Sequence, residues 1–179
     1  MSNKISIKDI TYCSVFTALI IVLSYISIPL PLSPVPITGQ SLAIMLTASI
    51  LNTKQTGLTI LTYLLLGIIG LPVFAGGGAG IGSLLGPKGG YLLGFLIGGL
   101  IISLLKRNKH KLISLLIANT IGGIIVVYTS GAIWLSLATN IQIKKSILIG
   151  VLPFIPGDII KALIASFIAI PINKRISKL

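Results

Sequence analysis

Long apolar runs, separated by short basic segments, are the feature that most limits how this chain folds. A helix needs about 20 apolar residues to cross the hydrocarbon core of a bilayer, and the 179 residues leave room for six such helices with short connectors. Only 9% of the residues are charged, against about 25% in soluble domains. The sequence therefore predicts one all-α, polytopic integral membrane domain over residues 1–179 and excludes a soluble enzyme that carries an anchor.

Six runs are expected to form transmembrane helices. They cover residues 10–32, 37–51, 56–69, 89–105, 112–134 and 157–172, and a weaker amphipathic stretch covers 144–152. The first run follows two lysines and so resembles a secretory signal peptide, but more apolar runs follow it and no A-x-A cleavage pattern ends it. We expect the prolines at 29–36 to end this helix, because proline cannot continue a helix.

The basic residues are distributed unevenly along the chain. Fourteen Lys and Arg oppose two acids, Asp9 and Asp158, for a net charge of +12. With a cytoplasmic N-terminus and six crossings, ten basic residues fall on inner segments, three on outer segments and one within a helix. The inner ten are Lys4, Lys8, Lys54, Lys106, Arg107, Lys109, Lys111, Lys174, Arg175 and Lys178, the outer three are Lys88, Lys144 and Lys145, and Lys161 is the last. This positive-inside bias predicts that both termini are cytoplasmic in the cell membrane.

Several kinds of function are disfavoured. A nucleic-acid partner needs one basic face with stacking aromatics, whereas these charges lie on separate loops. Cys13 and His110 are the only cysteine and histidine, so we expect no disulfide, no metal site and no bound cofactor. The glycine-rich connector at 70–90 matches neither a Walker A nor a G-x-G-x-x-G pattern, so any ATPase lies on another chain. An enzyme is disfavoured because Asp158 and one lysine offer too few catalytic groups. A channel is disfavoured because the sequence lacks the rings of polar residues that line a pore.

Asp158 and Lys161 are the strongest candidate site residues. Their i,i+3 spacing puts both on one face near the start of the last helix, in apolar surroundings. A charge at the bilayer centre costs about 2.5–3.5 kcal/mol, so it needs a partner or a polar cavity. Two interpretations stay open: a structural ion pair that fixes the helix start, and a ligand site that offers one acceptor and one donor. The second is favoured because intramembrane ionisable pairs usually line a pathway.

Weaker candidates surround the proline-rich and glycine-rich segments. Thr38 and Gln40 follow the prolines and face an outward cavity, or Thr38 caps the second helix. The connector at 70–90 either lines or caps a cavity, since lipid cannot satisfy its amides, or is only a tight, flexible connection between helices. Tyr91 contacts a ligand or belongs to an interfacial aromatic belt.

Two sets of small residues predict close helix packing. Gly90, Gly94 and Gly98 repeat at every fourth position of the fourth helix. Ser14 and Ala18 form a similar small-xxx-small face on the first helix. Such faces let backbones approach closely, so the Ser14 face meets another helix, either internal or on a partner protein.

Four segments, taken together, resemble the BioY family. They are Pro34-Val-Pro-Ile-Thr-Gly-Gln40, Gly70-Leu-Pro-Val-Phe-Ala-Gly-Gly77, Leu85-Gly-Pro-Lys-Gly-Gly-Tyr91 and Pro153-Phe-Ile-Pro-Gly-Asp-Ile-Ile-Lys161. The resemblance covers nearly the whole chain in order and spacing. It implies the biotin-binding S component of an energy-coupling factor (ECF) transporter, with six helices, a transmembrane T component and two cytoplasmic ATPases as partners. Alternatives are an S component for another small vitamin and a biotin transporter that works without partners.

The resemblance also implies roles for individual residues. Asp158 and Lys161 match the D-x-x-K pair of the family's biotin pocket, where Lys161 meets either the ureido oxygen or the valerate carboxylate of biotin. Tyr91 and the loop at 76–82 match the segment that closes over the ligand. Ser14 and Ala18 match the first-helix face that meets the T component.

The chain departs from the family pattern at two positions. Lys88 stands where threonine is common, and Gly78 stands where some relatives carry a polar side chain. Both are expected to contact the substrate, with Lys88 attracting the biotin carboxylate in place of the lost polar group.

Overall fold

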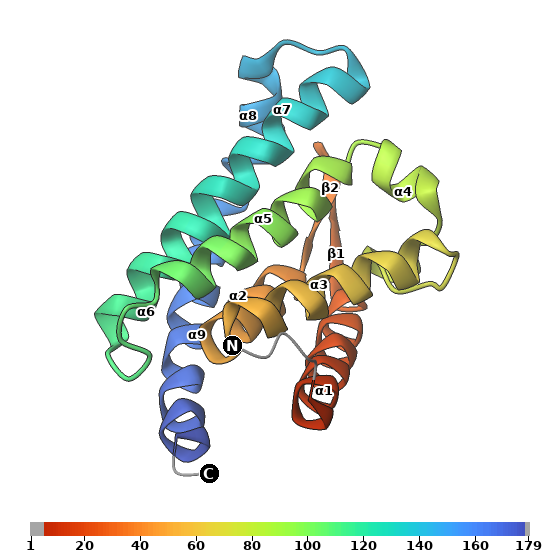
Figure 1. Cartoon of the computed structure of the whole chain (residues 1–179). Helices are drawn as coiled ribbons and strands as arrows, with labels where there is room; N and C mark the ends of the chain where they lie inside the picture. Colours follow the sequence, from red (N-terminus) through yellow and green to blue (C-terminus); the bar gives the residue numbers. More distant parts are fainter. Residues whose placement is uncertain (1–5, 178–179) are drawn as a thin grey trace.

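The computed structural model describes residues 6–177 and is built from helices, with one short β-hairpin toward one end (Figure 1). The main helices are α1 (Ile7–Ser24), α2 (Gln40–Ile50), α3 (Thr53–Ile68), α5 (Gly89–Leu105), the continuous run of α6 (Leu112–Ala118), η2 (Asn119–Val126) and α7 (Val127–Thr139), and α9 (Ile155–Ile176). Shorter elements are η1 (Ala75–Gly77), α4 (Ile81–Leu85) and α8 (Ile143–Gly150). The predominantly helical architecture is confirmed.

Three helices of the described chain are long and apolar enough to cross a membrane. They are α1, the run 112–139 and α9, while α2 and α5 are apolar but shorter. Ten of the 11 residues of α2 are buried, and its neighbours include α1, α5 and α9. At 1.5 Å per residue α2 is about 16 Å long, so it lies as a short central helix inside the protein rather than facing lipid.

The expected first span, 10–32, is wrong at its end. α1 stops at Ser24, and the proline-rich segment forms the antiparallel strands β1 (Ser27–Leu30) and β2 (Ser33–Thr38), with Ser27 paired to Thr38. The strictly all-α prediction is corrected by this hairpin. Proline lacks an N–H and blocks a helix, but its φ fits an edge strand, so a two-stranded hairpin accepts this segment where a helix cannot.

Other boundaries differ by a few residues. α3 begins at Thr53 because Asn52 caps it, its side chain accepting a hydrogen bond from the Gln55 amide at 2.9 Å. The run that begins at Leu112 continues to Thr139, where Asn140 ends it in the left-handed conformation. α9 is longer than predicted at both ends, and the connector at 70–90 contains η1 and α4.

The glycine seam of α5 is confirmed. A Cβ atom at Gly90 would lie 2.2 Å from Trp134 Cβ, at Gly94 2.3 Å from Ser130 Oγ, and at Gly98 2.2 Å from the Gly122 carbonyl oxygen. No larger residue fits at these distances, so α5 packs backbone to backbone against η2 and α7.

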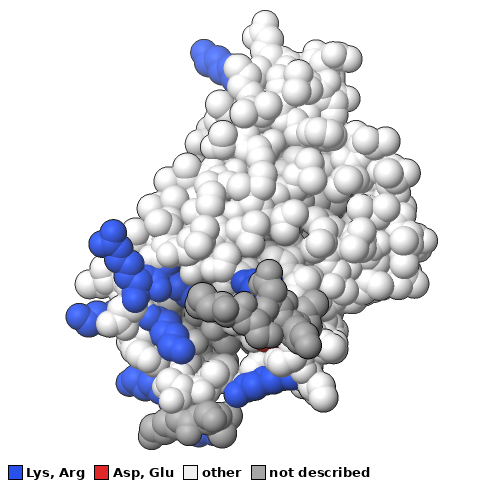
Figure 2. All heavy atoms as spheres, viewed as in Figure 1, with Lys and Arg blue, Asp and Glu red and all other residues white. Residues whose placement is uncertain are grey.

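Basic side chains gather at one end of the molecule (Figure 2). This end carries the start of α1, the α5–α6 loop and the end of α9, whereas the hairpin, α4 and α8 lie toward the other end (Figure 1). A separate basic side chain is visible near the α7–α8 turn (Figure 2). Lys4 and Lys178 lie outside the described residues.

Candidate functional site

A cavity of about 80 Å³ lies among β2, α2, the connector, α5, α7 and the start of α9. All seven substrate-binding candidates from the sequence line it: Thr38, Gln40, Gly78, Lys88, Tyr91, Asp158 and Lys161. Segments separated by more than 100 residues therefore meet at one place. Their role in binding stays a prediction, but their convergence is a property of the fold.

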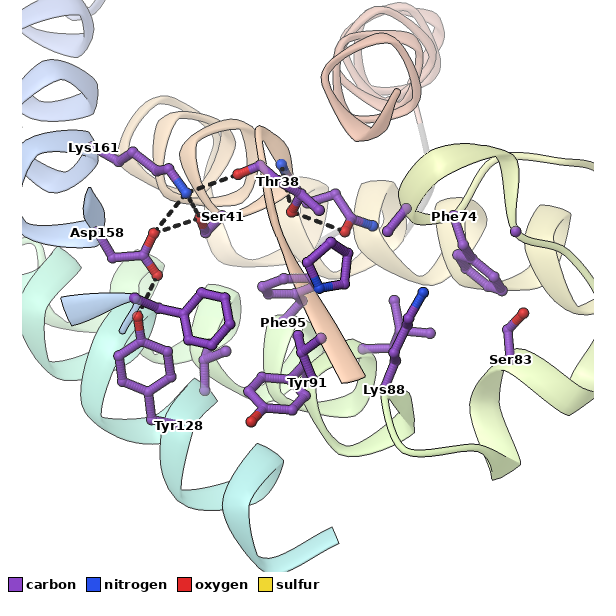
Figure 3. Close-up of a pocket in the computed structure, with 18 residues that line it drawn as sticks. Thr38, Ser41, Phe74, Ser83, Lys88, Tyr91, Phe95, Tyr128, Asp158 and Lys161 are labelled. Atoms are coloured by element: carbon purple, nitrogen blue, oxygen red, sulfur yellow. Dashed lines mark hydrogen bonds and ion pairs between the residues drawn. The ribbon is translucent and has the colours of Figure 1, made fainter. Parts of the chain in front are cut away.

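Asp158 is the centre of a buried polar cluster. It lies in the first turn of α9 with 6% of its surface exposed, where the helix N-terminus favours a carboxylate. Its Oδ1 accepts from Lys161 Nζ at 2.7 Å and from Ser41 Oγ at 2.9 Å, and its Oδ2 accepts from the Tyr128 hydroxyl at 2.7 Å (Figure 3). Three elements, α2, α7 and α9, thus hold one carboxylate.

Lys161 completes this cluster. Its Nζ donates to Asp158, to the Thr38 carbonyl oxygen at 2.7 Å and to Ser41 Oγ at 3.0 Å. An ammonium has three donors, so all of them are used. The buried ion pair is satisfied inside the protein, and a ligand that binds here must exchange hydrogen bonds with it.

Gln40 and Thr38 form a second polar group beside the first. Thr38 Oγ1 accepts from the Gln40 backbone amide at 3.3 Å and donates to Gln40 Oε1 at 3.1 Å. The N-cap of α2 is Gly39 and no side chain caps it, so the capping interpretation of Thr38 is wrong. Gln40 Nε2 donates to the hydroxyl of Tyr63. The Thr38 side chain therefore holds Gln40, while the Thr38 carbonyl holds Lys161.

Aromatic side chains form much of the remaining wall. Phe74, Tyr91, Phe95 and Phe154 all line the cavity and are buried. Tyr91 is 7% exposed, and its hydroxyl donates to the Gly150 carbonyl at 2.7 Å. It therefore offers its ring to the cavity while it ties α8 to α5, and an interfacial aromatic belt does not describe it.

The connector covers the cavity and is fixed at several points. Gly80 N–H donates to the Gly67 carbonyl at 2.7 Å, and Ser24 Oγ donates to the Val73 carbonyl at 2.6 Å. Gly76 and Gly80 have φ of 65° and 78°, a region that glycine adopts without strain. The connector is therefore an ordered cover and not a featureless linker.

Lys88 and Ser83 lie across the cavity from the Asp158 cluster (Figure 3). Lys88 is half-buried and has no ion-pair partner within residues 6–177. The cavity thus has a hydrogen-bonding cluster on one side, a cation on the other and aromatic rings between them. Such an arrangement fits a small ligand with a polar head, an apolar body and an anionic end.

The BioY family profile matches residues 1–178. The chain belongs to the BioY family. It is 39% identical to the biotin transporter BioY of Thermotoga maritima, over 93% of this chain and 96% of that protein. It is 38% identical to the biotin transporter BioY2 of Lactococcus lactis subsp. cremoris, over 94% of this chain and 92% of that protein.

A solved structure has the same fold. The crystal structure of the S-component for biotin from an ECF-type ABC transporter matches with a TM-score of 0.88 and 39% identity, over 97% of this chain and 95% of that one. The resemblance found in the sequence is therefore confirmed at the level of the BioY family. The named relatives are transporters, as expected.

Two polar partners of Asp158 were missed in the sequence, as were the cavity-lining rings of Phe95 and Phe154. Ser41 and Tyr128 bind Asp158 across 117 and 30 residues of chain. Ser41 directly follows the candidate Gln40, and Tyr128 places a hydroxyl inside an apolar run. Because a buried hydroxyl in a membrane helix needs a partner, that pattern was the available signal.

The Ser14 and Ala18 face of α1 points outward. Both residues are exposed, and their neighbours Val15 and Val22 are 59% and 64% exposed. An internal helix contact, one of the two alternatives, is therefore wrong within the described chain. The face is left for lipid or a partner protein.

Proposed function

We propose that this chain binds biotin in the cavity and serves as the substrate-specific S component of an ECF-type transporter. The observation that carries the proposal is the Asp158 cluster, which faces an aromatic cavity in a BioY-family fold. Biotin has ureido N–H groups, which a carboxylate accepts, and a ureido oxygen, to which an ammonium donates. Charge-assisted bonds of this kind are stronger than neutral ones.

We assign the two ends of the ligand by charge. All three Lys161 donors already have partners within the Asp158 cluster, so this side suits a neutral ureido ring. Lys88 lies across the cavity without an ion-pair partner in residues 6–177, so it suits the valerate carboxylate. The rings of Phe74, Tyr91 and Phe95 would contact the apolar body of biotin.

The proposed topology has six membrane segments, formed by α1, α2, α3, α5, the run 112–139 and α9, of which α2 is short and enclosed by the others. Both termini lie in the cytoplasm in this proposal. The gathering of basic side chains at one end supports this orientation, because cytoplasmic segments carry an excess of Lys and Arg. The cavity lies toward the opposite end and would open to the outside.

Transport in this proposal depends on other chains. A transmembrane T component and two cytoplasmic ATPases would supply the energy, and the exposed Ser14 and Ala18 face of α1 is the proposed contact with the T component. Biotin would cross unchanged, and no cofactor is required.

The first test is binding by the purified protein. Labelled biotin should bind, and unlabelled biotin should compete while other vitamins at equal concentration should not. Displacement by a different vitamin would overturn the assignment of substrate in favour of another S component.

The second test is co-purification with partners. A T component and two ATPases should purify with the tagged chain, and Ser14→Leu/Ala18→Leu should release them because bulky side chains prevent close helix contact. Val15→Leu, on the same exposed side of α1, is the matched control. Biotin uptake by cells that lack such partners would support transport by this chain alone.

A further inference from the structure

A second hollow lies at the opposite end of the molecule from the cavity. It is a groove of about 900 Å³ at the end of α5 and the start of α6. Arg107 and Lys111 line it together with the apolar residues Leu105, Ile113 and Ile117. None of these residues belongs to the biotin site proposed above.

Within residues 6–177, no acid pairs with the basic residues of the groove, Arg107 and Lys111. The two acids of the chain are engaged elsewhere: Asp9 accepts from Gln55 Nε2 at 2.7 Å, and Asp158 pairs with Lys161. The groove is also part of the end where basic side chains gather (Figure 2). Its charge is therefore complementary to an anion.

The apolar part of the groove lies beside these cations. Ile113 and Ile117 are 71% and 55% exposed, and their i,i+4 spacing puts them on one face of α6. Lys111 directly precedes the apolar run 112–139, whose mean hydropathy is 2.0. In a bilayer the cations therefore lie at the level of the lipid headgroups, with the isoleucines on the hydrocarbon side of them.

The loop that holds the cations is ordered by side-chain hydrogen bonds. The Asn108 amide donates to Ser114 Oγ at 3.1 Å, and Asn173 Nδ2 of α9 donates to the Lys109 carbonyl at 2.9 Å. Lys106 Nζ donates to the Ala48 carbonyl at 2.7 Å. The loop is thus fixed to α2, α6 and α9, so Arg107 and Lys111 are presented from a rigid support.

We propose that this groove binds one anionic phospholipid of the surrounding bilayer. Its phosphate contacts Arg107 and Lys111, and an acyl chain lies along Ile113 and Ile117. Guanidinium and ammonium groups are the usual partners of phosphate, and basic pockets at the ends of membrane helices bind anionic headgroups.

The test is native mass spectrometry of the purified protein, titrated with phosphatidylglycerol or with phosphatidylcholine of identical acyl chains. We expect one phosphatidylglycerol to bind about 30-fold more tightly than phosphatidylcholine, since each cation near the surface contributes about a fivefold effect. Arg107→Gln/Lys111→Gln should abolish this preference, and Arg107→Lys/Lys111→Arg should retain it. Lys144→Gln/Lys145→Gln removes the same charge at the other end and should change nothing.

Three results would overturn the proposal. One is equal binding of the two lipids by the unmodified protein, and another is an unchanged preference in Arg107→Gln/Lys111→Gln. The third is glycerol phosphate binding as tightly as the whole lipid, which would indicate a free-anion site without an acyl contact. An unfolding temperature equal to that of the unmodified protein verifies that each variant is folded.

Discussion

Replacing Asp158 by asparagine separates a ligand site from a structural ion pair. The substitution keeps the volume but removes the charge that accepts from Lys161, Ser41 and Tyr128. A hydrogen bond to a charged group contributes about 1.5–3 kcal/mol, against about 1 kcal/mol for a neutral one. If one ureido N–H binds the carboxylate, replacing that charged acceptor by the neutral amide oxygen costs about 0.5–2 kcal/mol and weakens biotin binding by about 2- to 30-fold.

The same change also affects folding, because it leaves the half-buried Lys161 ammonium without its counter-ion. Removing one partner of a buried pair destabilises by about 3–5 kcal/mol, whereas replacing both by neutral residues is often harmless. We therefore expect Asp158→Asn to unfold at a lower temperature than Asp158→Asn/Lys161→Met. The double variant should unfold close to the unmodified protein and still bind biotin at least about 10-fold more weakly.

Calorimetric titration with biotin, paired with thermal unfolding in the same detergent, measures both effects. Asp9→Asn is the matched control, because Asp9 is the other acid and lies outside the cavity, on α1. Recovery of stability together with full biotin affinity in the double variant would refute the reasoning, since the pair would then serve the fold alone.

Two further changes test the cavity, and a third tests the basic loop at the opposite end of the molecule. Lys88→Thr should weaken the binding of biotin by about fivefold but leave the binding of biotin amide unchanged. The ratio of the two dissociation constants measures this difference, and an unchanged ratio would place the carboxylate elsewhere. Gly78→Asn should fold normally, because a Cβ there lies 3.5 Å or more from its neighbours. It should tighten biotin binding by up to about tenfold through one added hydrogen bond, and weaker binding in the calorimetric titration would contradict this. Burial, together with repulsion from Lys109, lowers the pKa of Lys106 to about 7. The unfolded chain then binds one more proton than the folded chain between pH 7 and about 10. Stability relative to Lys106→Met should therefore rise with pH over this range, by at most about 1.4 kcal/mol per unit; a flat difference in unfolding free energy would show that the amine stays protonated.

Features set by local spacing could be predicted from the sequence. Asp158 and Lys161 share a helix face because they are three residues apart, and Gly90, Gly94 and Gly98 form a seam for the same reason. Helical periodicity depends only on neighbours along the chain, so such patterns survive folding. The resemblance to the BioY family added the expectation that Asp158, Lys161, Tyr91 and the loop at 76–82 belong to one pocket.

Features set by distant contacts could not be predicted in this way. Tyr128 reaches Asp158 because the run 112–139 packs against α9, and Ser41 reaches it because α2 is buried beside α9. The hairpin at 27–38 was missed because prolines reveal where a helix stops but not which strand will pair with which. Tertiary packing decides both the contacts of Asp158 and the pairing of the two strands. A single apolar run contains little information about tertiary packing.

The narrowness of the cavity has a kinetic consequence. Ligand pockets usually enclose about 300–1,000 Å³, whereas this one holds about 80 Å³ beneath the ordered connector. Entry of biotin into this cavity, as proposed, would require the connector to move aside. The observed association rate would then reach a plateau as ligand concentration rises, and the plateau would equal the opening rate. The apparent dissociation constant would be the intrinsic constant divided by the open fraction, so a connector that opens more readily would speed capture and tighten apparent binding.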